Sequence, residues 1–205
     1  MSRFADRVRQ FRSTEYPKRE SLFQSLAGGQ SPEALMICCS DSRVNPTLLT
    51  GSEPGDLFVL ENAGNMVPAP EHGAGGGEAA TVEYAVKALG VPEIIVCGHA
   101  KCGAMGGLMN PDALGELPEV AGWLKNGGST REDVLARLPD ASPEEQLAEA
   151  IRANVLLQIE NLRLYPHVAE AERAGDLTLH GWVYDFVTGA VVRHDPQTGQ
   201  WVEIL

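Results

Sequence analysis

Three short, predominantly apolar segments constrain the fold of this 205-residue chain more than any other feature. They cover residues 35–39, 57–60 and 91–97, and residues 78–89 between the last two have the apolar spacing of a helix. Continuous apolar strands separated by helices are typical of a mostly parallel sheet that is covered on both faces. The expected fold class is therefore α/β, a mostly parallel central sheet flanked by helices.

The segments on either side of this core predict additional elements. Residues 1–30 have apolar side chains at helical spacing and are expected to form an N-terminal helical arm, which lies either on its own domain or on a neighbouring subunit. Residues 104–174 are predicted to be mostly helical, with a capping box at Ser142 opening a long helix. Alternation over 177–184 and 190–193 predicts a C-terminal antiparallel edge strand or hairpin. We expect one domain over 1–205, with the arm at 1–30 and the α/β core at 31–205.

Composition narrows the possible functions. The 28 acidic and 16 basic residues give a net charge of −12, which disfavours binding to nucleic acid and to an anionic membrane. The apolar runs are too short to span a bilayer, and the charged residues 1–12 lack the apolar stretch of a signal peptide. We therefore expect a cytoplasmic protein, in which the four cysteines are more typically thiols or metal ligands than disulfides.

Two motifs follow the first and third predicted strands. Cys39 opens the sequence Cys-Ser-Asp-Ser-Arg, and His99 and Cys102 belong to Gly-His-Ala-Lys-Cys-Gly. Functional sites of open α/β sheets form beyond the carboxyl ends of the strands, so the two motifs are expected to converge. Two thiolates and one imidazole suit zinc, and three protein ligands leave a fourth position open, as in catalytic zinc sites. The alternative for each cysteine alone is core packing, which we expect for Cys38 and Cys97.

Asp41 and Arg43 are the candidate catalytic pair. Asp41 follows Cys39 by two residues and can lie beside the fourth metal position, where a carboxylate would accept a hydrogen bond and orient a bound hydroxide. Arg43 can hold that carboxylate with a bidentate pair. On these residues alone, the alternative is an ordinary salt bridge within a loop.

Together, the motifs closely resemble those of the β-class carbonic anhydrases. The similarity is strong over residues 20–110 and continues into Gly-Trp-Val-Tyr-Asp at 181–185, while Glu-Asn-Ala-Gly-Asn at 61–65 resembles the family's Arg-Asn-Ala-Gly-Asn. The resemblance implies one zinc ion per chain, bound by Cys39, His99 and Cys102, and an Asp41–Arg43 dyad at the fourth ligand. It also implies substrate-binding roles for a further set of positions: Gln30, Phe58, Ala63, Tyr84 and the backbone N–H of Gly103.

The implied reaction is the reversible hydration of CO₂ to bicarbonate and a proton, by attack of a zinc-bound hydroxide on CO₂. In such enzymes the substrate pocket is completed across a dimer interface, so a homodimer or higher homo-oligomer is expected. Two alternatives stay open: hydrolysis of carbon disulfide or carbonyl sulfide at the same site, and a non-catalytic zinc-bound scaffold subunit. The dyad speaks against the scaffold, because a structural zinc site has no use for an oriented hydroxide.

Some positions depart from the family pattern and indicate a subgroup. Gln30 resembles the substrate-binding glutamine of the plant-type subgroup. Another subgroup of the family binds bicarbonate at a second, non-catalytic pocket and is inhibited by it. The pattern of that pocket is a Trp three residues before the first Cys ligand and an Arg before Asn-x-x-Asn. Met36 and Glu61 occupy those two positions here, and Lys101 stands between the ligands where a small residue is common. The sequence therefore predicts the plant-type subgroup, with Asp41 paired to Arg43 at neutral pH.

Overall fold

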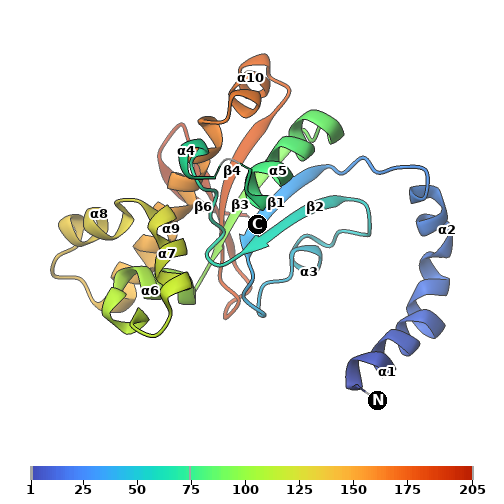
Figure 1. Ribbon diagram of the computed structural model, residues 1–205, viewed down its shortest axis with the longest axis horizontal. Coiled ribbons are helices and arrows are strands. Elements are labelled where there is room, and N and C mark those ends of the chain that lie inside the picture. The colour runs from blue at the N-terminus through green and yellow to red at the C-terminus, as the bar shows by residue number, and fades with distance from the viewer. Residues whose placement is uncertain (1, 74, 205) are drawn as a thin grey trace.

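A six-stranded sheet forms the centre of the computed structural model, which describes residues 2–73 and 75–204 (Figure 1). Its spatial order is β2-β1-β3-β4-β5-β6. The first four strands pair in parallel, and the last two pairings, β4 with β5 and β5 with β6, are antiparallel. The strands are β1 Ala34–Cys39, β2 Leu57–Asn62, β3 Glu93–His99, β4 Thr178–Tyr184, β5 Val191–Asp195 and β6 Gln200–Glu203. This arrangement confirms the predicted α/β class and its antiparallel C-terminal edge.

Helices connect the strands and cover the sheet. An arm precedes the sheet, and a mostly helical stretch between β3 and β4 includes a 21-residue helix, α9, that begins at the predicted capping box. The helical elements are α1 Arg3–Gln10, the π-helical turn Phe11–Glu15, α2 Tyr16–Leu26, α3 Pro46–Thr50, α4 Pro70–Gly73, α5 Gly77–Glu83, the π-helical turn Tyr84–Leu89, α6 Gly103–Met109, the 3₁₀ turn Pro111–Leu114, α7 Pro118–Leu124, the 3₁₀ turn Lys125–Gly127, α8 Thr130–Arg137, α9 Pro143–Arg163 and α10 Pro166–Ala174. Among the described residues, no helix combines the length and apolarity needed to cross a bilayer.

Several boundaries differ from those that the sequence predicts. The third strand begins at Glu93 rather than at residue 91, because the Val91 N–H still bonds to the Ala85 carbonyl and Pro92 has no N–H to donate. It then continues to His99, two residues beyond the apolar run. Strand β6 was not predicted, since its exposed polar ends conceal the alternation around Trp201 and Val202.

The two faces of the sheet carry different layers. Leu35, Ile37 and Val96 face the cluster that contains Val155 and Ile159 of α9. Alternate residues of the same strands face the other side, where the hydrophobic cluster is smaller. Its buried members are Ala34, Met36, Cys38, Val44, Ile95 and Cys97, and the half-buried side chains packed against them are Leu49, Leu57, Trp182 and Tyr184. This alternation places Cys39 on the α9 side and Cys38 on the opposite side.

The predicted helical arm is present and extends away from the sheet (Figure 1). None of its residues in α1 is buried, and the side chains of Phe4 and Val8 are each 64% exposed. Arg19 in α2 forms an ion pair with Glu53 of the core at 2.6 Å, so the second helix of the arm contacts the core. Helix α1 therefore leaves its large apolar side chains mostly uncovered by the described part of the chain.

Candidate active site

Strands β1 and β3 bring the two sequence motifs together. The strands are adjacent and parallel, with Cys38 opposite Cys97, so Cys39 and His99 end their strands at the same edge of the sheet. Cys102 follows in a tight turn in which Lys101 adopts φ +56°, a left-handed conformation that reverses the chain within three residues. The two sulfur atoms and one imidazole nitrogen of Cys39, His99 and Cys102 all lie within 4.8 Å of one another.

The chemistry of this cluster fits a zinc ion. All three side chains are buried, and His99 is fully so. Its Nδ1 lies 2.9 Å from the Ala100 carbonyl, so Nδ1 carries the proton and Nε2 is left with a free lone pair. Among the described residues, this buried Nε2 has no hydrogen-bond partner. A buried nitrogen lone pair beside two sulfurs is the donor set of a three-ligand zinc site.

The two cysteine sulfurs differ in acidity because they share one proton. A hydrogen bond from the Cys102 thiol lowers the pKa of Cys39 to about 4 against the opposing effect of burial, with help from the backbone N–H of Gly64. The same bond and burial raise the pKa of Cys102 above its ordinary value. One sulfur of the cluster is thus already prepared as a thiolate, which is the form that binds metals.

Asp41 and Arg43 form the expected dyad. Arg43 Nε and Nη2 donate to the two oxygens of Asp41 at 2.8 and 2.7 Å, and the Arg43 backbone N–H adds a third bond at 3.0 Å. These bonds, the side-chain ones first, hold the pKa of Asp41 well below its ordinary value. Asp41 Oδ2 lies 3.9 Å from His99 Nε2, so the ionised carboxylate stands directly beside the cluster.

Aromatic and backbone contacts fix the arginine of this dyad. The Arg43 guanidinium carbon lies 4.2 Å from the centre of the Phe186 ring, a cation–π arrangement. Arg43 Nη2 also donates to the Lys101 carbonyl at 3.4 Å. The loops after β1, β3 and β4 therefore meet at one side chain. Phe186 was not predicted from the sequence, although it directly follows the family-like segment 181–185.

Cys38 and Cys97 lie outside the cluster. Both are fully buried in the smaller core on the opposite face of the sheet. Burial is the leading cause that raises the pKa of Cys38 above its ordinary value and that of Cys97 to about 12, so both remain thiols. The prediction that they pack in the core is confirmed.

The residues assigned to substrate binding fall into two groups. Ala63 directly follows β2, whose last residue pairs with Cys39, and Gly103 is the first residue of α6, next to Cys102. These two lie at the same edge as the cluster. Gln30, by contrast, is exposed and precedes the opposite end of β1. Because β1 advances about 3.3 Å per residue, its two ends are about 17 Å apart.

Phe58 and Tyr84 belong with Gln30 at that opposite end. Phe58 pairs with Leu35 near the start of β1, and its ring lies 5.9 Å from that of Tyr84. Tyr84 is 51% exposed. The structure therefore does not bring Gln30, Phe58 or Tyr84 to the three candidate metal ligands of their own chain.

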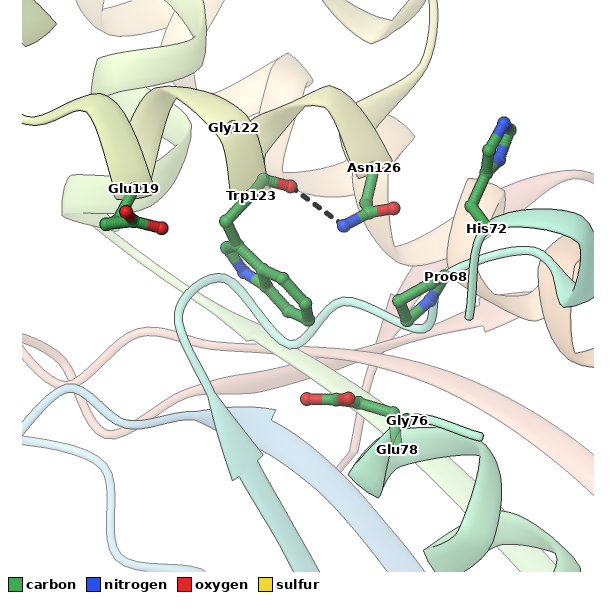
Figure 2. Close-up of a pocket in the computed structure, with 8 residues that line it drawn as sticks. All are labelled: Pro68, His72, Gly76, Glu78, Glu119, Gly122, Trp123 and Asn126. Atoms are coloured by element: carbon green, nitrogen blue, oxygen red, sulfur yellow. Dashed lines mark hydrogen bonds between the residues drawn. The ribbon is translucent and has the colours of Figure 1, made fainter. Parts of the chain in front are cut away.

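A loop between β2 and α4 closes the cluster from a third side. The backbone N–H of Gly64 donates to Cys39 Sγ at 3.3 Å, and Gly64 adopts φ +81°, where a Cβ would lie 3.0 Å from that of Ala104. A pocket of about 390 Å³ lies beside this loop (Figure 2) and is lined by Pro68, His72, Gly76, Glu78, Glu119, Gly122, Trp123 and Asn126. None of the three candidate ligands lines that pocket.

Comparison with known proteins agrees with this geometry. The family model described as carbonic anhydrase matches residues 34–191. A carbonic anhydrase of Pseudomonas aeruginosa is 47% identical over 95% of this chain and 87% of its own length, and one of Synechocystis is 45% identical over 95% and 71%. The solved β-carbonic anhydrase CcaA superimposes with a TM-score of 0.95 at 43% identity, covering 99% of this chain and 91% of its own. The chain therefore belongs to the carbonic anhydrase family, within its β class.

Proposed function

We propose that this chain catalyses the reversible hydration of CO₂ to bicarbonate and a proton, with one zinc ion held by Cys39, His99 and Cys102. The observation that carries the proposal is the cluster itself, in which two buried sulfurs and a buried imidazole nitrogen lie within 4.8 Å of one another, and residues 2–73 and 75–204 offer that nitrogen no hydrogen-bond partner. The ionised Asp41 beside the cluster supplies a carboxylate that can orient a metal-bound hydroxide, and a purely structural zinc site would not need one.

The reaction needs a strong nucleophile at neutral pH. A zinc ion bound by these ligands lowers the pKa of water and so supplies that nucleophile. Asp41 Oδ2 lies 3.9 Å from His99 Nε2 and so stands beside the position that a metal-bound water would take. There Asp41 would accept a hydrogen bond from that water and orient its lone pair toward CO₂. Arg43 keeps Asp41 ionised and immobile through two parallel hydrogen bonds.

We further propose that each substrate pocket combines two copies of the chain. Ala63 and the N–H of Gly103 come from the copy that holds the metal. Gln30, Phe58 and Tyr84 come from the second copy, because they lie at the opposite end of β1 in their own chain. The exposed Tyr84 and the adjacent Phe58 offer an apolar surface for CO₂, and the Gln30 amide can bond to a bicarbonate oxygen.

Charge distribution supports a homodimer or larger homo-oligomer in which the arm packs on another copy. Residues 1–30 carry six basic and three acidic side chains, so the remaining 175 residues hold a net charge of −15. The exposed Phe4 and Val8 supply the apolar part of such a contact. A structural relative is described as a tetrameric β-carbonic anhydrase of Sordaria macrospora, at 30% identity and a TM-score of 0.82.

The remaining expectations belong to the same proposal. We propose that residues 1–205 act as one domain, with residues 1–30 as the arm and 31–205 as the core. We also propose the plant-type subgroup and a cytoplasmic location, the latter because all four cysteines are free and buried.

Stopped-flow CO₂ hydration by the purified, zinc-analysed protein tests the proposed reaction. Carbonyl sulfide and carbon disulfide should be supplied in parallel assays. We expect CO₂ hydration to be by far the fastest reaction. Hydrolysis of a sulfur substrate without CO₂ hydration would reassign the substrate, and a fully zinc-loaded protein without any of the three activities would indicate a scaffold.

A further inference from the structure

The peptide between Ala63 and Gly64 connects the candidate metal ligand Cys39 to Trp123, which lies outside the ligand set. The N–H of this peptide donates to Cys39 Sγ at 3.3 Å. The carbonyl oxygen of the same peptide, on Ala63, accepts a hydrogen bond from Trp123 Nε1 at 2.7 Å. The N–H and C=O of a trans peptide point in opposite directions within one rigid plane. The hydrogen bond from the indole to the carbonyl therefore fixes the orientation of the N–H that contacts the sulfur.

Trp123 reaches this peptide from α7. Figure 2 shows its ring extending from the helix toward the loop, where it also forms one wall of the 390 Å³ pocket. Hydrogen bonds in series polarise one another, so the indole donor strengthens the N–H bond to sulfur as well as orienting it. The α7 helix thus acts on Cys39 through a single peptide unit.

The next peptide of the loop is held from another helix. Asn154 Nδ2 of α9 donates to the Gly64 carbonyl at 3.0 Å, and its Oδ1 accepts from Gln158 Nε2 at 2.9 Å. Gln158 Oε1 in turn accepts from the Val67 N–H at 2.8 Å. Asn154 and Gln158 are 1% and 0% exposed, so water does not compete for these bonds.

Helix α9 is itself fixed close to the sheet. A Cβ at Gly98 would lie 2.9 Å from Val155, and one at Gly181 would lie 3.0 Å from the same side chain. Glycines at both positions therefore permit a close approach of α9 to β3 and β4, and any shift of the helix would require repacking of these strands. This rigidity extends through Asn154 to the Gly64 loop.

We propose that Trp123 and Asn154 are positioning residues that fix the two peptides flanking Gly64 and thereby set the N–H···S hydrogen bond to Cys39. An N–H bond to a thiolate withdraws electron density that the sulfur would otherwise donate to a metal. The two residues therefore tune the charge at the metal without touching it. This inference rests on the proposed role of Cys39 as a ligand.

Trp123→Phe is the direct test, because it removes the indole N–H and keeps an aromatic ring, although a smaller one. Trp201→Phe is the matched control, since it makes the same exchange on β6. Asn154→Leu and its control Gln146→Leu form a second pair on one helix, since Gln146 also donates to a backbone carbonyl, that of Leu138 at 2.9 Å, but makes no bond to the loop after β2.

Two spectroscopic readouts report on the bond itself. In the cobalt-substituted protein, the thiolate-to-metal charge-transfer band should move to lower energy in Trp123→Phe and Asn154→Leu, because a sulfur without its N–H bond is a better donor. In the cadmium-113 protein, the scalar coupling between the metal and the Gly64 amide proton should be lost. Neither control should change these signals. We expect hydration to fall by about 10-fold, the lower end of the range for outer partners of metal ligands.

The outcomes separate the two proposals. If the wild-type protein shows no thiolate–metal band, the assignment of Cys39 as a ligand fails and this inference fails with it. If the wild-type band is present but is unchanged in Trp123→Phe and Asn154→Leu, the inference alone is overturned. A loss of thermal stability with unchanged spectra would likewise overturn it, since that result indicates a structural role only.

Discussion

Arg43 binds both carboxylate oxygens of Asp41 with one edge of its guanidinium and stacks on Phe186 at 4.2 Å. The carboxylate is therefore held on one side by paired hydrogen bonds and faces His99 Nε2 on the other, at 3.9 Å. This geometry assigns different tasks to the two residues. In the proposed mechanism Asp41 contacts the reacting water, whereas Arg43 fixes the charge and direction of Asp41.

Substitution of the dyad should separate metal binding from turnover. In Asp41→Asn the side chain keeps its size but loses its charge, so zinc should stay and the hydration rate should fall by about 10–100-fold or more. Arg43→Ala should lose at least as much, because it leaves Asp41 unpaired. Stopped-flow rates and zinc content measured on the same samples check both expectations. Near-normal rates in both variants would reduce the dyad to a structural salt bridge.

The pH dependence should be alkaline. Two thiolates cancel the charge of zinc, so its bound water should be less acidic than the pKa of about 7 found with three histidines. Asp41 does not supply this transition: its pKa is lowered by Arg43, so it stays ionised as pH rises and is protonated only in strong acid. We expect kcat/KM for hydration to rise through pH 7 into the alkaline range. A rate that is already flat from pH 6 upward would contradict this.

Bicarbonate should not inhibit the enzyme cooperatively. Met36 is fully buried in the strand core and offers no indole N–H, and Glu61 is exposed and would repel an anion. We expect a hyperbolic inhibition curve in the wild type and in Glu61→Arg, because the arginine alone restores only part of the second pocket. A sigmoidal curve in the wild type, or a structure near pH 7.5 with Asp41 bound to zinc, would place the chain in the other subgroup.

A shared pocket predicts complementation between two inactive variants. Gln30→Ala keeps its own ligands but lacks the amide that it lends to the second copy, and Cys102→Ala lacks a metal site but keeps Gln30. When the two are mixed under conditions of subunit exchange, mixed dimers regain one complete site. Hydration should therefore rise above the sum of the separate variants. Strictly additive activity, with exchange verified by mass spectrometry, would show that Gln30 does not serve the second copy.

The sequence predicts the three candidate metal ligands better than the loop that surrounds them, for a physical reason. Cys39 and His99 end adjacent parallel strands, and strand ends of this class converge whatever the remaining packing is. The bond from Trp123 to the Ala63 carbonyl joins residues 60 positions apart through a loop, and neither residue carries a local pattern that marks it. Loop conformation of this kind depends on tertiary contacts.

The placement of Gln30 illustrates a second limit. Family resemblance assigns it to the substrate pocket, yet strand geometry places it at the opposite end of β1 from Cys39. Only the two observations together indicate a second copy. Strand β6 was missed because four residues with exposed polar ends do not show a clear alternation.

CO₂ hydration by this chain should depend on a zinc ion held by Cys39, His99 and Cys102. The most direct measurement is zinc content and hydration rate, determined together for the wild type, Cys102→Ala and the control Cys97→Ala. Cys97 is as buried as Cys102 but lies on the opposite face of the sheet. We predict about one zinc per chain and full activity in the wild type, nearly the same in Cys97→Ala, and loss of both in Cys102→Ala. Full zinc occupancy with a normal rate in Cys102→Ala would contradict the account.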